Sequence, residues 1–568
     1  MGYVRKNKKI SVAVVALIGT CAIGVLFAMG VLSLLTALQL VALGAIGAGV
    51  SAVMVWARRV DRRVRDVHLS LVDGKRAAVE GGKESGLRSG MEWRISARAH
   101  EARERARSLY GEGRVQEAVD ELVPYAALDD PADRARRRLI GNRRAIGPLP
   151  ELPERNSGEL PPVPGRVLHF VTNALPNTQA GYTVRTHRIV LAQRDAGLDP
   201  HVVTFPGWPG PEEGDTEGRR DVDGIPYHRI RPGERCGLGL QERIEVAITE
   251  GTALARLLRP AVLHAASDHK NATVALHVGR ALGIPVVYEM RGFLEETWLS
   301  HEGATSRRGS ERHRLLVERE SSVLRAADAV VTLADTMRSE IIGRGVAPER
   351  VVMAPNAVDE RLLREQPDGA SFRESFGIAE QERVVGSVSS LTHYEGFETL
   401  IEAAVLLRDR GREVRVLLVG DGPARPDLLD LAERRGLGGG CLLPGRVDPD
   451  EALRAQAALD VMVVPRIDAR VTRLVTPLKP VEAMALGVPV IASDLPALRE
   501  LVDDGRAGTL IPPGDPAALA DAIMSLDKDA ELREACVRAG REEVESRRTW
   551  GHNAEVYRAL YARLGALS

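Results

Sequence analysis

The sequence predicts an α/β protein with two core-forming domains behind an apolar N-terminal segment. Near the C-terminus, residues 475–493 combine a helix start, a glycine stop and a short buried strand, which is the alternation typical of α/β domains. The chain has 568 residues, enough for two hydrophobic cores. Residues 10–57 contain no charged side chain, so this segment needs a separate explanation.

The uncharged run predicts a membrane anchor over residues 1–57. As a helix of about 48 residues it would extend roughly 72 Å, whereas a hydrocarbon core is about 30 Å thick, so two transmembrane helices fit. Basic residues flank the run on both sides: Arg5, Lys6, Lys8 and Lys9 before it, and Arg58, Arg59, Arg62, Arg63 and Arg65 after it. We therefore expect a multi-pass cell-membrane protein with cytoplasmic catalytic domains. The rival interpretation, a cleaved signal peptide, expects a shorter run with a small-residue cleavage site.

Residues 58–146 are rich in Arg, Ala and Glu and predict a helical spacer. Within it, residues 103–127 resemble one helix-turn-helix unit of the tetratricopeptide kind. A single unit cannot bury a continuous core, because about three are normally needed. The segment is therefore either a spacer or a docking stalk for a protein partner. Six prolines in residues 147–164 predict a stiff, extended linker.

Composition excludes several classes of function. The net charge is −1, with 77 Lys and Arg against 78 Asp and Glu, so no basic surface for nucleic acid is implied. The four cysteines are scattered and show no C-x-x-C spacing, which indicates neither a zinc site nor a disulfide framework. The segment Asp221-Val222-Asp223 has a metal-binding D-x-D form, but it precedes a predicted hairpin at residues 224–229. We therefore expect no metal and no cofactor.

The helix start at residues 475–493 predicts an anion site. Thr476 is a good N-cap and Pro477 suits the first helical position. A capping box would place Glu or Gln two residues later, yet the chain has Lys479. Free helix amides together with a lysine favour a bound phosphate, and Glu482 would accept hydrogen bonds from a sugar of the same ligand. The plain alternative is an ordinary helix with an exposed lysine.

This segment resembles the nucleotide-binding signature of the retaining glycosyltransferases of family 4, which have the GT-B fold of two facing Rossmann-like domains. Other segments resemble further parts of that fold in the same order: residues 165–171, 283–292, 327–332, 352–359 and 416–423. The resemblance covers residues 165–568. It implies an N-terminal acceptor domain (165–365), a C-terminal nucleotide-sugar domain (366–548) and a helix that returns to the first domain (549–568).

Two departures from the family pattern concern the donor site. Members usually carry E-x-x-x-x-x-x-x-E; Glu482 matches the second glutamate, but the first falls on Leu474. Many members also have a G-R-L-x-x-x-K-G stretch, whose counterpart at residues 389–396 lacks both cations. A subgroup with similar Y-E-G and T-P-L-K-P segments has the same features. We hypothesise that Arg466 and Lys479 replace the missing cations.

The candidate site residues follow from this resemblance. Those expected to bind the donor are Arg466, Thr476, Pro477, Leu478, Lys479 and Glu482. Those expected to line the cleft and meet the acceptor are Gly181, Arg185, Glu289, Arg291 and Asn356. Those expected to act near the reacting sugar are His264, His269 and Lys479. Structural alternatives stay open: a turn for Gly181 and Asn356, a solvated Arg185, and a salt bridge between Glu289 and Arg291.

The predicted function is that of a membrane-anchored glycosyltransferase. By resemblance, it moves a sugar with retention of configuration from a nucleotide diphosphate donor to a lipid-linked or envelope polysaccharide acceptor. The alternative is a catalytically degenerate scaffold that binds nucleotide-sugar and recruits partners through residues 58–146. The missing first glutamate favours the scaffold, whereas the preserved helix start favours the enzyme.

Overall fold

The computed structural model describes residues 83–156, 161–210, 218–231, 239–300 and 307–567. The two predicted transmembrane helices lie outside these ranges. Among the described helices, none is long and apolar enough to cross a membrane. The chain from Ala99 onward forms one compact unit, and the description below concerns that unit.

The first domain is built on an eight-stranded sheet with the order β3-β4-β2-β1-β5-β6-β7-β8. All neighbouring strands are parallel except the β3–β4 hairpin. The strands are β1 (Val163–Val171), β2 (Asp199–Thr204), β3 (Arg219–Val222), β4 (Ile225–Arg229), β5 (Pro260–Ala266), β6 (Val286–Met290), β7 (Ala329–Thr332) and β8 (Val351–Met353). A hairpin is present as predicted, but it includes the D-x-D segment instead of following it: Asp221 and Val222 lie in β3, and Asp223 lies in the turn.

Helices cover both faces of this sheet, which is why β5 and β6 are buried at every position. One face packs against α8 (Leu240–Leu258), α9 (His269–Leu282), α11 (Glu311–Ala326) and α12 (Asp335–Gly343). The other face packs against α7 (Gly181–Asp195) and α22 (Trp550–Arg563). Side chains along β5 therefore alternate between the two faces of the sheet. Val262 packs in the core under α7 and α22, and Leu263 packs in the core under α8, α9, α11 and α12. A short helix, α10 (Leu294–Leu299), follows β6.

The second domain has a six-stranded, fully parallel sheet with the order β11-β10-β9-β12-β13-β14. Its strands are β9 (Val384–Val388), β10 (Arg415–Val419), β11 (Cys441–Gly445), β12 (Val461–Val464), β13 (Val490–Ser493) and β14 (Thr509–Ile511). Its helices are α13 (Gly369–Ser375), α14 (Phe397–Asp409), α15 (Arg425–Arg434), α16 (Pro449–Ala457), α17 (Arg470–Leu474), α18 (Lys479–Ala485), α19 (Pro496–Leu501), α20 (Pro516–Lys528) and α21 (Ala530–Arg547). The buried strand expected after Gly487 is β13.

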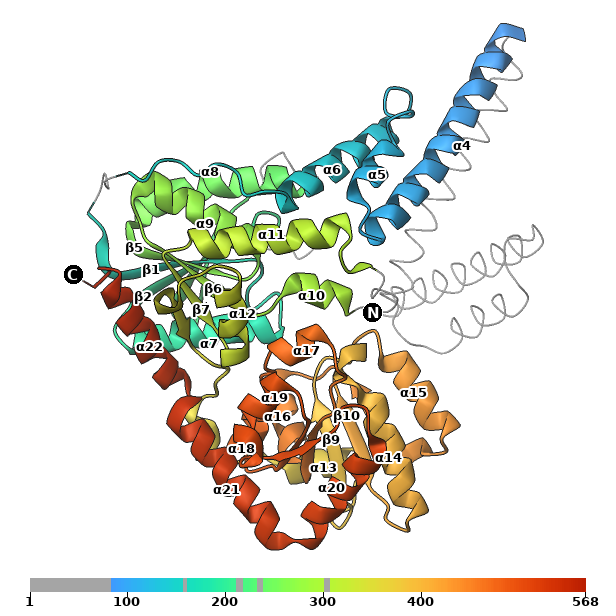
Figure 1. Ribbon diagram of the computed structural model, residues 1–568, viewed down its shortest axis with the longest axis vertical. Coiled ribbons are helices and arrows are strands. Elements are labelled where there is room, and N and C mark those ends of the chain that lie inside the picture. Colours follow the sequence, from blue (N-terminus) through green and yellow to red (C-terminus); the bar gives the residue numbers. More distant parts are fainter. Residues whose placement is uncertain (1–82, 157–160, 211–217, 232–238, 301–306, 568) are drawn as a thin grey trace, which may run out of the picture. The chain divides into compact units, whose positions relative to one another are not determined.

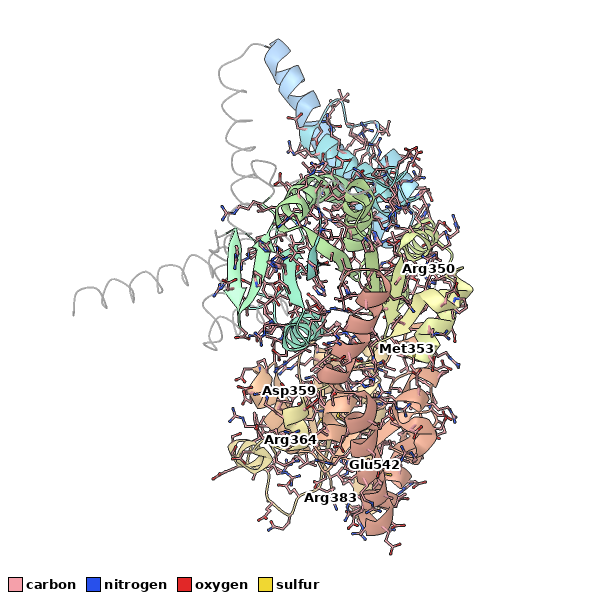
Figure 2. The ribbon with its side chains drawn as sticks, turned by 90° about the vertical axis from the view of Figure 1, so that its left-hand side faces the viewer. Arg350, Met353, Asp359, Arg364, Arg383 and Glu542 are labelled. Carbon is pink, nitrogen blue, oxygen red and sulfur yellow. The ribbon has the colours of Figure 1, made fainter. Side chains whose placement is uncertain are left out.

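The chain passes between the two domains twice. Figure 2 follows the first passage from Met353 at the end of β8 through Asp359 to Arg364. The return is made by α22, which packs beside α7 on the first sheet although it follows the second domain in sequence (Figure 1). Trp550 and Tyr557 of α22 are buried in that core, which agrees with the returning helix expected over residues 549–568.

From Ala99 onward, the helical spacer is docked on the first domain. It comprises α4 (Lys83–Gly111), α5 (Val115–Asp120) and α6 (Asp130–Ile146), with a small core of its own. Arg319 on α11 is 1% exposed and donates hydrogen bonds to the carbonyls of Arg144 (2.9 Å), Gly147 (2.6 Å) and Pro148 (3.0 Å) at the end of α6. The helical spacer is thus stabilised by contact with the neighbouring domain and not by further repeats.

Replacing Arg319 with Met should remove the contact between α11 and the end of α6. The substitution removes three hydrogen bonds and leaves the carbonyl of the buried Gly147 without its donor, and an unsatisfied buried group costs about 1–3 kcal/mol. We expect a fall of roughly 2 kcal/mol in the free energy of unfolding, measured by urea denaturation, and faster protease cleavage within residues 148–156. Arg325→Met on the same helix removes a partly exposed arginine and is the matched control. Equal effects of the two variants would contradict the assignment.

Candidate cleft between the two sheets

A cavity of about 360 Å³ lies where the carboxyl ends of strands from both sheets meet. Loops after β1, β5 and β6 contribute its first-domain wall, and loops after β9 and β12 contribute its second-domain wall. The polar residues of the first wall include Thr172, Asn173, Tyr182, Asp268, Lys270 and Arg291. The second wall includes Tyr394, Arg466, Thr472 and Val475. Open parallel sheets bind their ligands at this end, because loops of adjacent strands converge there.

The helix of the T-P-L-K-P segment begins later than the sequence predicts. Helix α18 starts at Lys479, with Leu478 at the N-cap position and no side-chain cap bond. The predicted cap at Thr476 and first helical position at Pro477 are therefore wrong. The Thr476 carbonyl is held by a hydrogen bond from Asn356 (2.9 Å), which keeps this residue outside the helix. The Thr476 hydroxyl is buried and has no hydrogen-bond partner among the described residues.

Lys479 and Glu482 form an ion pair on the first turn of α18. The Lys479 Nζ lies 3.0 Å from Glu482 Oε2, and the side chains are 33% and 14% exposed. Both groups thus remain reachable from solvent, but the lysine charge is partly balanced by its neighbour. A phosphate at this helix start would compete with Glu482 for the ammonium group. The pair is consistent with a donor site and equally with a local salt bridge.

Arg466 is not a free cation. Its guanidinium makes a two-pronged ion pair with Glu395, with Nη2–Oε1 at 2.7 Å and Nε–Oε2 at 3.0 Å, and donates to the Val475 carbonyl (2.9 Å). Gly396 has φ +70°, and a Cβ there would lie 2.2 Å from the Pro465 carbonyl oxygen. The Y-E-G segment and Arg466 are therefore one packed unit. The hypothesis that Arg466 replaces a missing cation stays a prediction: the side chain lines the cavity, but its charge is balanced by Glu395.

Glu289 is the centre of a buried polar cluster in the first domain. It is 0% exposed and pairs with Arg185 (2.8 Å) and Arg291 (2.9 Å). His264 (3.1 Å) and the hydroxyl of Tyr557 (3.2 Å) lie within hydrogen-bond distance of the same carboxylate. Burial by itself would raise the pKa of Glu289, but the two arginines hold it well below its usual range. The salt-bridge alternative for Glu289 and Arg291 is the arrangement present, and Arg291 also reaches the cavity wall.

His264 does not face the cavity. It is 0% exposed, its Nδ1 lies 2.6 Å from the Tyr561 hydroxyl, and its ring stacks on His169 with centroids 4.7 Å apart. Burial lowers its pKa, although Glu289 acts in the opposite direction. A buried imidazole with both nitrogens engaged has no path to a reacting sugar. The expectation that His264 acts on substrate is therefore replaced by a packing role under α22.

His269 also lies outside the cavity lining. It is the first residue of α9 and is buried, and its Nδ1 has no hydrogen-bond partner among the described residues. Burial lowers its pKa to about 4, so the ring is neutral at pH 7. The neighbouring Asp268 and Lys270 form an ion pair that does line the cavity. His269 itself does not line the cavity, whereas the residues on either side of it do.

Arg185 and Asn356 are buried between the domains rather than exposed to an acceptor. Besides Glu289, Arg185 donates to the Ala354 carbonyl (2.8 Å) and to Asn356 Oδ1 (3.1 Å). An acceptor phosphate contact for Arg185 is therefore excluded by its burial. Gly181 is the exposed first residue of α7, and a Cβ there would meet no described atom within 4 Å, so the protein itself does not require glycine there.

Several cavity residues were not predicted from the sequence. Asn173 donates to the Tyr182 hydroxyl (3.1 Å), and together they form the rim beside α7. Asp268 and Lys270 follow β5, and Tyr394 follows β9. The available signal was their position directly after predicted strands, because strand carboxyl ends converge on the ligand side of a parallel sheet. Across the described residues, no three His, Cys, Asp or Glu side chains are grouped so as to hold a metal ion.

Two family models match the chain. The model described as glycosyl transferase 4-like domain matches residues 180–357, and the one described as glycosyl transferases group 1 matches residues 369–543. The first match covers most of the first sheet and the second match covers the whole second sheet. Both domains of the cleft therefore carry glycosyltransferase sequence patterns, which supports a transferase.

Curated relatives are also glycosyltransferases. The chain is 30% identical to alpha-D-kanosaminyltransferase of Streptomyces kanamyceticus over 45% of this chain and 65% of the relative. It is 33% identical to phosphatidyl-myo-inositol mannosyltransferase of Mycobacterium leprae over 38% and 53% respectively. It is 28% identical to 2-deoxystreptamine N-acetyl-D-glucosaminyltransferase of Streptomyces fradiae over 63% and 85%. The first of these matches thus spans slightly less than two thirds of the relative's length.

Solved structures share the GT-B-like arrangement of two Rossmann-like sheets. Sucrose-phosphate synthase of Thermosynechococcus elongatus superposes with a TM-score of 0.58 at 20% identity, covering 71% of this chain and 100% of that structure. HepE of Anabaena in complex with UDP-glucose gives a TM-score of 0.53 at 20% identity, covering 70% and 99%. These likenesses establish the fold.

The pH dependence of stability tests the burial of His269. Because its folded pKa is about 4 against an ordinary value of 6.5, the unfolded chain takes up a proton first as the pH falls. The stabilisation is complete above about pH 6.5 and is lost as the pH approaches 4. Between pH 7.5 and 5, the unfolding free energy of the wild type should fall about 2 kcal/mol more than that of His269→Asn. Parallel urea titrations of both proteins measure this, and equal slopes would contradict the burial.

Proposed function

We propose that this protein is a membrane-anchored, retaining glycosyltransferase that moves a sugar from a nucleotide diphosphate donor to a lipid-linked or envelope polysaccharide acceptor. The observation that carries the proposal is the cavity between the carboxyl ends of two sheets that both match glycosyltransferase models. A neighbour of the same fold is solved with UDP-glucose, which supports a nucleotide-sugar as the donor.

The start of α18 is the proposed diphosphate site. Sugar transfer leaves negative charge on the departing diphosphate, and donors already in place stabilise that charge without reorganisation. Lys479 supplies the cation, and Leu478 and Pro477 shape the approach. The hydroxyl of Thr476 is buried and unpartnered here, so it would have to become accessible before it could donate to the diphosphate. Glu482 would then leave Lys479 and accept from the sugar hydroxyls of the nucleotide. Closure of the two walls around the donor would exclude water from the reaction.

The acceptor is proposed to enter from the first-domain wall. There Tyr182, Asn173 and the Asp268–Lys270 pair offer hydrogen bonds beside Arg291. The uncharged run over residues 10–57 with its basic flanks supports a cell-membrane location with cytoplasmic domains, which favours acceptors carried on lipid or destined for the envelope. No metal or cofactor takes part in this proposal.

A nucleotide-sugar-binding scaffold is the second candidate. Two observations favour it: Leu474 occupies the place of the first family glutamate and packs against the first-domain core, and the Arg466 charge is balanced by Glu395. A scaffold would bind the donor without releasing nucleotide. The enzyme would release nucleotide and, slowly, free sugar even without its acceptor.

Lys479→Ala and Glu482→Ala should each weaken donor binding by about tenfold, because a charge-assisted hydrogen bond is worth roughly 1.5–3 kcal/mol. The measurement is a thermal-shift and calorimetric titration of the full-length chain with UDP-, GDP- and ADP-sugars. Lys528→Ala, at the last residue of α20, is the control and should bind as the wild type does. Unchanged affinity in both site variants would contradict the proposal that the start of α18 binds the diphosphate. Binding without nucleotide release in any assay would favour the scaffold.

A further inference from the structure

Three consecutive carbonyls in front of α18 are held by side chains from three different elements. The Leu474 carbonyl accepts from Thr336 Oγ1 on α12, and the Thr476 carbonyl accepts from Asn356 Nδ2 in the crossover, each at 2.9 Å. Between them, the Val475 carbonyl accepts from Arg466 Nη1, also at 2.9 Å. Two of these three donors belong to the first domain or its crossover, although the segment itself belongs to the second.

Asn356 joins this segment to the wall of the cavity. Its Oδ1 accepts from Arg185, whose guanidinium also binds Glu289. Glu289 in turn pairs with Arg291, which donates to the Tyr182 carbonyl (3.2 Å) in the first turn of α7. A continuous line of polar contacts therefore runs from the start of α18 to the acceptor-side rim. Asn356 is the link in this line that needs both a donor and an acceptor, which an amide provides and a carboxylate does not.

We propose that Thr336 and Asn356 are positioning residues that couple the donor-binding segment 474–479 to the arrangement of the two domains. This inference rests on the proposed function for its catalytic consequence. When the domains are arranged as here, both residues fix the backbone that leads to Lys479. When the domains separate, both bonds break together and the segment loses two of its three side-chain anchors.

The physical basis is the extended backbone of the segment. Val475 has φ −107° and ψ 123°, between the end of α17 and the start of α18. A buried carbonyl without a hydrogen bond is destabilising, so the segment holds this path only while its side-chain donors are in place. Donor binding and domain closure then favour each other, because each pre-orders the same three residues.

Hydrogen–deuterium exchange of the free, full-length protein tests the coupling without any donor. Thr336→Val and Asn356→Asp should each raise the exchange rate of the peptide spanning residues 474–482 by about tenfold. Thr332→Val and Asn271→Asp are matched controls. Thr332 donates to the Met290 carbonyl and Asn271 donates to the Ala266 carbonyl, both inside the first domain. Neither control contacts the segment, so both should leave its exchange unchanged.

Nucleotide binding and kinetics provide the second readout. Thr336→Val and Asn356→Asp should raise the KM for the donor about three- to tenfold and leave the KM for the acceptor unchanged, whereas the controls lower only thermal stability. Unchanged exchange of residues 474–482 in both variants, or an equal rise in the controls, would overturn the inference. A wild type that binds no nucleotide would refute the proposed function instead, and the exchange result would still decide the coupling.

Discussion

The carboxylate of Glu289 is the charge on which the first-domain wall of the cleft depends. Two arginines approach it from opposite sides, one from α7 and one from the end of β6, and without it both would be cations with no counter-charge. Removing one partner of a buried ion pair is far more costly than never forming it. The same carboxylate also meets the Tyr557 hydroxyl on the returning helix. Glu289 thus connects the first sheet with helix α7 and helix α22.

The second domain has a similar but smaller cluster, in which one buried carboxylate pairs with one arginine. Glu395 and Arg466 neutralise each other between the loops that follow β9 and β12, and the guanidinium also holds the backbone before α18. Both buried clusters hold polar groups in place by charge pairing, but only the Glu395–Arg466 pair is neutral, because Glu289 faces two arginines. The Lys479–Glu482 pair on the first turn of α18 stays partly exposed, which is why the proposed diphosphate site is placed there and not at Arg466.

The helical spacer is also held by a buried arginine from another part of the chain. A single tetratricopeptide-like unit has too little apolar surface to be stable alone. Here the helix that follows the unit, α6, ends against Arg319, which donates hydrogen bonds to three backbone carbonyls. The unit is thereby an extension of the first domain rather than a separate stalk. Any partner of this region would meet surfaces other than the one facing α11.

The sequence by itself determined the α/β class, a hairpin near the D-x-D segment and the buried strand after Gly487, because these depend on neighbouring residues. It also indicated where the cleft loops fall, since they follow predicted strands. It did not reveal that Arg466 is paired with a residue 71 positions away, or Arg185 with one 104 positions away. Whether a histidine or an arginine faces a ligand or a buried carboxylate depends on which strands become neighbours. Only the tertiary structure decides that, because burial and charge pairing arise from contacts that local patterns do not encode.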